Sequence, residues 1–157
     1  MKKTVDASNY HLSTHCTKGS IHWFEIPEPD RNISSLKVRP FIIISRNNHN
    51  SKRVLISPVQ NLENYIENGQ VKYPYHVPLL KSEYNFLEKD LVILLDQVYT
   101  IEKAKLYEEL FMGEMSNFEK LDNAIMYNFD LYESIRKGIT DLLYQYQDLY
   151  KKDFSRK

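Results

Sequence analysis

Four polar residues lie beside short apolar runs, where a side chain can leave the core and act on a ligand. Arg39 precedes one run, Gln60 and Asn61 follow a second, and Asp96 ends a third. A guanidinium group offers a rigid fork that suits phosphate oxygens. An amide forms hydrogen bonds with the same oxygens but cannot act as a base, whereas a half-buried carboxylate can. These residue types are compatible with chemistry at a phosphate group.

The composition is that of one compact domain. The chain has 157 residues, is 42% hydrophobic and 27% charged, and carries 21 basic and 21 acidic residues. Because the basic and acidic residues are equal in number, the protein as a whole has no positive field. A nucleic acid would therefore have to bind at a local basic patch. The single cysteine, Cys16, cannot form an intrachain disulfide. No secretory signal and no run of about 20 apolar residues is present, so we expect a soluble, cytoplasmic protein without a membrane partner.

Short apolar runs separated by turn residues predict a small antiparallel sheet or barrel. The segment 40–60 reads as a hairpin, and Pro58 predicts a strand end or a sheet edge. The run 91–95 is the most hydrophobic, which predicts the central strand. The stretches 27–38 and 61–72 are polar and predict long loops. Further strands are expected at 21–26 and 73–80.

The C-terminal third predicts helices, so the fold class is α+β. A first apolar stripe repeats at spacings of three and four residues, and Ser116 with Glu119 forms a possible capping box. Gly138 marks a predicted break between the two stripes. The first stripe contains Phe118, Leu121, Ile125, Phe129 and Tyr132, and the second contains Ile135, Ile139, Leu142, Leu143, Tyr146, Leu149 and Tyr150.

Four blocks, in order and spacing, resemble the MazF/PemK toxin family. The first is similar to the family's opening strand, the second to its Arg-Pro with a following apolar strand, and the third to a strand ending in a Pro-Ile-Thr-Ser-like tetrapeptide. The last is similar to its Leu-Asp-Gln-Ile-Arg-Thr-Ile-Asp-Lys signature. The blocks are KGSIHWFEIP at 18–27, VRPFIIIS at 38–45, VLISPVQN at 54–61 and LDQVYTIEK at 95–103.

This resemblance implies a strongly twisted antiparallel sheet with a few helices that works as a homodimer. It implies a toxin that cleaves single-stranded RNA without a metal or cofactor and is neutralised by a cognate antitoxin. The expected division is a polar arm at 1–17, the toxin domain at 18–133 and an added amphipathic helix with a charged tail at 134–157. The same fold also carries toxins that bind DNA gyrase, so a non-catalytic toxin, or a degenerate member that only binds RNA or antitoxin, remains an alternative.

The resemblance also assigns roles to the four polar residues. Arg39 occupies the position of an essential arginine and would stabilise charge at phosphorus, the alternative being a surface salt bridge. Gln60 and Asn61 replace the family's Thr or Ser. Asn61 would orient the 2′-hydroxyl or stabilise charge, the alternative being that the two residues merely end a strand. Asp96 is either the base or a structural acid. Tyr99 replaces an arginine and would stack on a base instead.

Three further residues are candidate RNA contacts. His22 lies on the first strand, where a lone histidine is more often a core or surface residue. Arg46 and Arg53 flank the 40–60 hairpin turn and could reach phosphates, although a solvated turn is the simpler reading. The spacing of the cysteine and nearby histidines fits no standard zinc pattern, so we expect no metal site.

Overall fold

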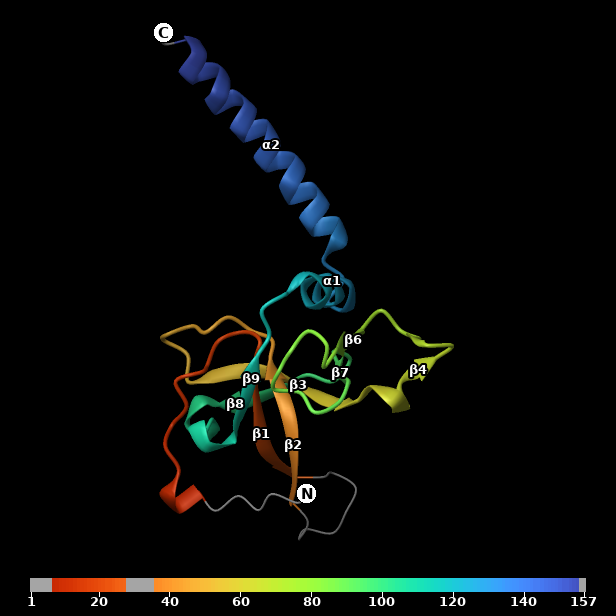
Figure 1. The fold of residues 1–157 in the computed structure, drawn as a ribbon. Coiled ribbons are helices and arrows are strands. Elements are labelled where there is room, and N and C mark those ends of the chain that lie inside the picture. Colours follow the sequence, from red (N-terminus) through yellow and green to blue (C-terminus); the bar gives the residue numbers. More distant parts are fainter. Residues whose placement is uncertain (1–6, 28–35, 156–157) are drawn as a thin grey trace.

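The computed structural model describes residues 7–27 and 36–155, so most of the predicted 27–38 loop lies outside the described residues. Within them, seven strands form one curled antiparallel sheet, and two helices follow it (Figure 1). The strands of this sheet are β1 (Ser20–Pro27), β2 (Leu36–Ile43), β3 (Arg53–Asn61), β6 (His76–Leu79), β7 (Leu91–Leu94), β8 (Tyr99–Glu102) and β9 (Phe111–Glu114). The predicted α+β class with a small twisted sheet is confirmed.

The strand order is β6-β7-β3-β2-β1-β9, with β8 attached to β3. The middle of the sheet is therefore β3 and β2, and the prediction that 91–95 is the central strand is wrong. β7 lies next to the edge strand β6, yet all four of its residues are buried. Its unbroken apolar run reflects burial on both faces, which sequence alone does not distinguish from a central position.

Pro58 lies inside β3, opposite Phe41 of β2, and not at a strand end. On its other side, β3 pairs with β8 up to Ile56 and with β7 from Val59 onward. The two partners separate at Pro58, where a proline costs no ladder hydrogen bond because no strand accepts one there. The same change of partner lets the sheet curl around its core.

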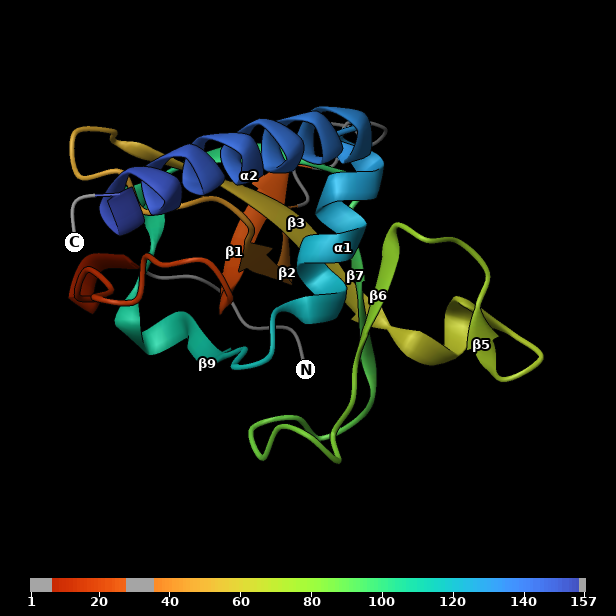
Figure 2. The same ribbon diagram turned by 90° about the horizontal axis from the view of Figure 1, so that it is seen from above.

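The predicted 61–72 loop contains a second, two-stranded sheet. β4 (Ile66–Glu67) pairs with β5 (Gln70–Val71), and Asn68 and Gly69 between them both have positive φ, as a tight turn requires. This hairpin extends sideways beyond β6 in both ribbon views (Figures 1 and 2). Gln60 and Asn61 lie at the end of β3, shortly before this hairpin, and are half-buried.

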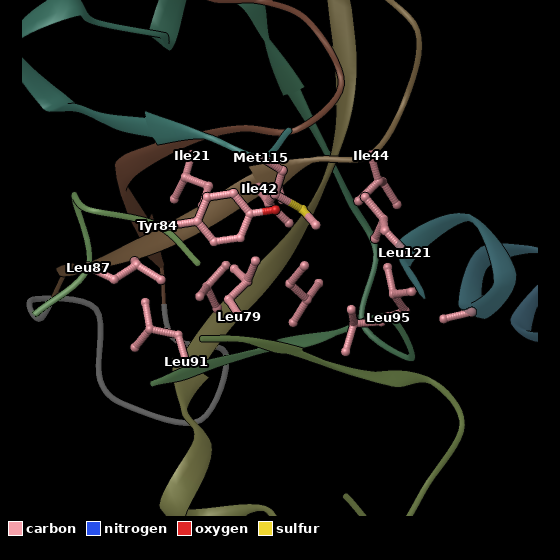
Figure 3. Packing of buried hydrophobic residues seen from close by; sticks show 14 residues of the cluster. Ile21, Ile42, Ile44, Leu79, Tyr84, Leu87, Leu91, Leu95, Met115 and Leu121 are labelled. Carbon is pink, nitrogen blue, oxygen red and sulfur yellow. The ribbon is translucent and has the colours of Figure 1, made fainter. Parts of the chain in front are cut away.

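The main core lies between the sheet and α1 (Glu119–Asn128), with Leu121 of the helix fully buried. Figure 3 shows side chains of β1, β2, β6 and β7 meeting one another and the helix. A residue of this size contributes roughly 1.5–3 kcal/mol when fully buried. The labelled members are Ile21, Ile42, Ile44, Leu79, Tyr84, Leu87, Leu91, Leu95, Met115 and Leu121.

The predicted capping box is wrong, because α1 begins at Glu119 and this residue is too early to reach back to Ser116. The Asn117 side chain accepts the hydrogen bond from the Glu119 amide instead, at 3.2 Å. The predicted break at Gly138 is also displaced. The chain turns at Asp130, where φ is 56°, and Gly138 lies within α2 (Tyr132–Ser155).

α2 projects away from the sheet (Figure 1). Its apolar side chains are open to solvent, with Ile139 52% and Leu142 65% exposed. Of the partners that could cover an added amphipathic helix, which are its own sheet domain, the dimer mate or an antitoxin, the sheet domain does not cover these side chains. The Tyr132 hydroxyl donates to the Asn123 carbonyl and ties the first turn of α2 to α1. No helix among the described residues is long and apolar enough to cross a membrane.

The described part of the predicted arm is attached to the sheet domain. The Ser13 amide donates to the Leu106 carbonyl, and the Glu108 amide donates to the His11 carbonyl. The His11 amide and ring also contact the Glu109 carboxylate, which lowers the pKa of that carboxyl. Residues 11–13 thus form an added edge segment along 106–108, where Leu12 pairs with Tyr107.

Candidate active site

Three of the four predicted catalytic residues line one cavity of about 670 Å³. Arg39 enters it from β2, and Gln60 and Asn61 enter it from the end of β3. All three side chains are half-buried. The remaining lining residues are Trp23, Pro40, Val59, Phe86, Glu88, Lys89, Leu91, Phe111 and Met112.

Strand pairing explains why these residues meet. β2 pairs with both β1 and β3, so Arg39 lies opposite Phe24, and its neighbour Pro40 lies opposite Trp23. On the other side of β3, Asn61 lies opposite Leu91 at the start of β7. The cavity therefore opens beside the middle of β2, where β3 ends and β7 begins, and the sheet ladder fixes the backbone of its polar residues.

The loop that precedes β7 forms one wall of this cavity. The Lys81 amide donates to Asp90 Oδ1 at 2.9 Å and closes the base of the loop, and buried Leu87 anchors its far side. Phe86 lies directly over Gly113 of β9, where a Cβ atom would stand 2.4 Å from the ring. Only glycine leaves room for this ring at that point.

Five aromatic or charged lining residues were not predicted as site residues. Trp23, Phe86 and Phe111 give the cavity aromatic walls on which a nucleobase can stack. Glu88 and Lys89 add a carboxylate and an ammonium group. Trp23 lies within a family-like block. It could have been predicted as a site residue, because it is an aromatic residue on the strand that pairs with Arg39-Pro40. The other four carry no sequence signal, because a loop and an unpredicted strand bring them to the cavity.

Asp96 and Tyr99 lie elsewhere. Leu91 lines the cavity at the start of β7, whereas Asp96 follows the other end of that strand, which spans roughly 10 Å. The Asp96 side chain is 44% exposed and lies 3.9 Å from His76 Nε2. Tyr99 is exposed and touches the Phe41 ring edge-on. Neither residue lines the cavity around Arg39.

His22 is a core residue, which corrects its prediction as an RNA contact. Its side chain is 0% exposed and contacts the rings of Phe24 and Phe111. Nε2 lies 2.9 Å from the Ser13 hydroxyl, while Nδ1 has no hydrogen-bond partner. Burial lowers the pKa of His22 to about 4, helped by nearby His15 and opposed by Glu108 and Glu114. The ring is therefore neutral and out of reach of a ligand.

The hairpin arginines do not join the cavity around Arg39. Arg46 lines a separate hollow between the 44–50 loop and α1, together with Lys18 and His49. Lys18 forms an ion pair there with Asp122. Arg53 is exposed at the start of β3, opposite Glu102 of β8. Both arginines are open to solvent, where phosphate contacts would be screened by salt.

The histidines and cysteine near the N-terminus do not form a metal centre. Among the described residues, no group of three or more His, Cys, Asp or Glu side chains is placed to hold a metal ion. His15 instead lies between Glu108 and Glu114, 3.4 Å from each, and stacks on Phe111 at 3.9 Å. Cys16 is a half-buried free thiol whose pKa is raised by burial.

Comparisons with known proteins agree with this fold. A family model described as PemK-like, MazF-like toxin of type II toxin–antitoxin system matches residues 17–129. A protein named Endoribonuclease MazF from Staphylococcus epidermidis is 35% identical over 104 residues, covering 62% of this chain and 82% of that protein.

Two solved structures are similar in fold. An endoribonuclease in complex with its cognate antitoxin, from a mycobacterial species, has a TM-score of 0.54 at 17% identity and covers 73% of this chain and 95% of that one. A second mycobacterial endoribonuclease has a TM-score of 0.52 at 15% identity, covering 80% and 98%. The matched family region ends within the turn after α1, so α2 lies beyond it.

Proposed function

Because the chain belongs to the family of PemK-like, MazF-like toxins of type II toxin–antitoxin systems, we propose that it is an endoribonuclease that cleaves single-stranded RNA without a metal ion. The observation that carries this proposal is the cavity in which Arg39 meets two amides and three aromatic rings. The proposal includes a cytoplasmic location, a homodimer and a cognate antitoxin.

Each part of the cavity suits one task in cleavage by the adjacent 2′-hydroxyl. The Arg39 guanidinium would bind the phosphate oxygens and stabilise the extra negative charge of the five-coordinate phosphorus. Gln60 and Asn61, held at the end of β3, would orient the 2′-hydroxyl through their amide groups. Trp23, Phe86 and Phe111 would stack on unpaired bases, which a duplex cannot present.

The purified chain should cut a long single-stranded RNA in the presence of EDTA and should spare duplex regions of the same molecule. The expectation follows from a cavity that offers its own cation at phosphorus and aromatic surfaces for splayed bases. The measurement is the cleavage map of one RNA that contains both hairpins and open stretches. Loss of cutting in EDTA, or equal cutting of duplex, would contradict the proposal.

The second candidate is a toxin that binds DNA gyrase and does no chemistry. The observation in its favour is that Gln60 and Asn61 stand where the family has Thr or Ser, so these two positions offer no hydroxyl. The same assay decides, when it is run beside a gyrase reaction. Intact RNA together with a stalled gyrase–DNA complex would support this candidate.

We expect that α2 is an architectural addition outside the chemistry. Because Ile139, Leu142 and Tyr146 are exposed along one helix, we expect the dimer mate or the antitoxin to cover it. Ending the chain after Tyr132 keeps the hydrogen bond to Asn123 and should lower solubility or weaken association.

The truncated chain should still cut RNA at the same positions as the full chain. The measurement is a side-by-side cleavage map, with sedimentation velocity to report association of each form, alone and with antitoxin. A changed cleavage motif would mean that α2 contacts the substrate. Unchanged solubility and association would contradict its proposed packing role.

A further inference from the structure

The cavity around Arg39 still lacks an acid and a base if only the predicted residues act. Transfer of the phosphate requires a group that accepts the 2′-hydroxyl proton and a group that protonates the leaving oxygen. Arginine stays protonated, and the amides of Gln60 and Asn61 do not titrate. Asp96 lies beyond the other end of β7 and does not line the cavity.

The cavity does contain one carboxylate and one ammonium group among its described lining residues. Glu88 and Lys89 follow buried Leu87 and precede Asp90 at the closed base of the loop. Both side chains are exposed at the rim, on the wall that faces the end of β3. They are the groups of this site whose charge can change during a reaction, because the guanidinium stays protonated.

The backbone around this pair is held on both sides. The Leu62 amide donates to the Asp90 carbonyl at 3.1 Å, which ties the loop to the residue after Asn61. On the other side, the Leu87 amide donates to the Tyr84 carbonyl, and Phe86 rests against Gly113. Glu88 and Lys89 are therefore placed by the same strand ends that place Gln60 and Asn61.

We propose that Glu88 and Lys89 are the proton-transfer pair of this site, with RNA phosphodiester as substrate; this rests on the proposed function. Glu88 accepts the proton of the 2′-hydroxyl, and the 2′-oxygen forms a bond to phosphorus while Arg39 holds the phosphate oxygens. The bond from phosphorus to the 5′-oxygen breaks, and Lys89 gives that oxygen its proton. The products are a 2′,3′-cyclic phosphate and a 5′-hydroxyl, with no electron transferred and no co-reactant needed.

The test uses Glu88→Gln and Lys89→Met in the full chain, with single-turnover rates measured on an RNA that has one cleavable site. Each substitution should slow cleavage by about 100-fold or more, the usual contribution of a positioned acid or base. The matched controls are Glu83→Gln and Lys81→Met, which change the same residue types on the same loop but outside the cavity lining, and they should stay near the wild-type rate.

A second substrate separates the two roles. In an RNA whose leaving 5′-oxygen is replaced by sulfur, the thiolate leaves without protonation. The Lys89→Met defect should therefore largely disappear on this substrate, whereas the Glu88→Gln defect should remain. The pH–rate profile should lose its acidic limb in Glu88→Gln and its alkaline limb in Lys89→Met.

The outcomes distinguish this proposal from the proposed function. If the wild-type chain cuts RNA and Glu88→Gln cuts at the same rate, the proton-transfer pair is wrong and the endoribonuclease remains. Suppose that both Glu88→Gln and Lys89→Met cleave slowly. If the sulfur-substituted RNA restores the cleavage rate of both variants, or of neither, the assigned roles of acid and base are wrong. If the wild-type chain leaves RNA intact in EDTA, the proposed function itself fails. Circular dichroism of each variant reports whether the loop changes leave the fold intact.

Discussion

Arg39→Ala should lower the single-turnover rate of RNA cleavage by roughly 100- to 1,000-fold, equivalent to about 2.7–4 kcal/mol of transition-state stabilisation. The guanidinium is the fixed cation of the cavity and enters it from a strand that pairs on both sides. Toxicity in cells should be lost in parallel. The thermal unfolding midpoint should change little, because the side chain lines a cavity and is not part of the buried core.

Arg46→Ala is the matched control, since it removes the same side chain from a solvent-exposed hollow on another part of the molecule. It should reduce the rate by only a small factor, and that factor should shrink as salt is added. Equal losses from the two substitutions would point to a diffuse electrostatic role. In that case the specific assignment of Arg39 to the reacting phosphate would be wrong.

The second large effect is a loss of stability in mild acid caused by His22. Burial lowers the pKa of this ring from its ordinary value of 6.5 to about 4 in the folded chain. Between these two pH values the unfolded chain binds a proton that the folded chain excludes, so stability falls as pH falls. At about 1.4 kcal/mol for each pKa unit, the loss from above pH 6.5 to pH 4 is about 3 kcal/mol.

Hydrogen bonding fits a neutral His22 ring. The Ser13 hydroxyl lies 2.9 Å from His22 Nε2 and 3.2 Å from Glu108 Oε2, so it can donate to the carboxylate while it accepts from the ring. Nδ1 then carries the lone pair that has no partner. Protonation would place an unpaired N–H in the core between Phe24 and Phe111, which is costly.

Urea unfolding measured from pH 4 to pH 7 tests this effect, and His22→Gln should flatten the pH dependence across that range. The control His49→Gln changes an exposed histidine and should leave the dependence unchanged. If the His22 variant does not fold, an NMR titration of the His22 ring in the wild-type chain measures its pKa directly. A His22 ring that titrates near pH 6.5 would contradict the account.

The sequence blocks selected three residues that line one cavity, whereas the apolar pattern misplaced one strand in the sheet. Arg39, Gln60 and Asn61 line one cavity because each adjoins an apolar run that forms a strand, and β2 and β3 are neighbours in the sheet. By contrast, the 91–95 run predicted a central strand, and this was wrong. A continuous apolar run indicates burial on both faces of a strand, and a strand next to the sheet edge can be buried in the same way. β9 was not predicted, since its short sequence Phe-Met-Gly-Glu does not alternate between apolar and polar residues. It also contains Gly113, whose missing side chain leaves room for the Phe86 ring.

The remaining part of the site depends on loop geometry, which no local pattern encodes. Glu88 and Lys89 read as two charged residues in a polar stretch until the Lys81–Asp90 hydrogen bond and the burial of Leu87 fix the loop. His22 shows the opposite error. A polar residue in a family-like block predicted a ligand contact, whereas its hydrogen bond to Ser13 allows it to be buried.

Cleavage of an RNA with one 2′-deoxynucleotide tests the central claim most directly. The scissile bond of an unmodified RNA is first mapped in EDTA, and the nucleotide on its 5′ side is then replaced by its deoxy form. The account predicts no cleavage at that bond, while the modified RNA still competes with the unmodified one for binding, because the attacking oxygen is missing and the cavity is intact. Cleavage of the deoxy-substituted bond at an undiminished rate would contradict attack by the 2′-hydroxyl and the role of this cavity in activating it.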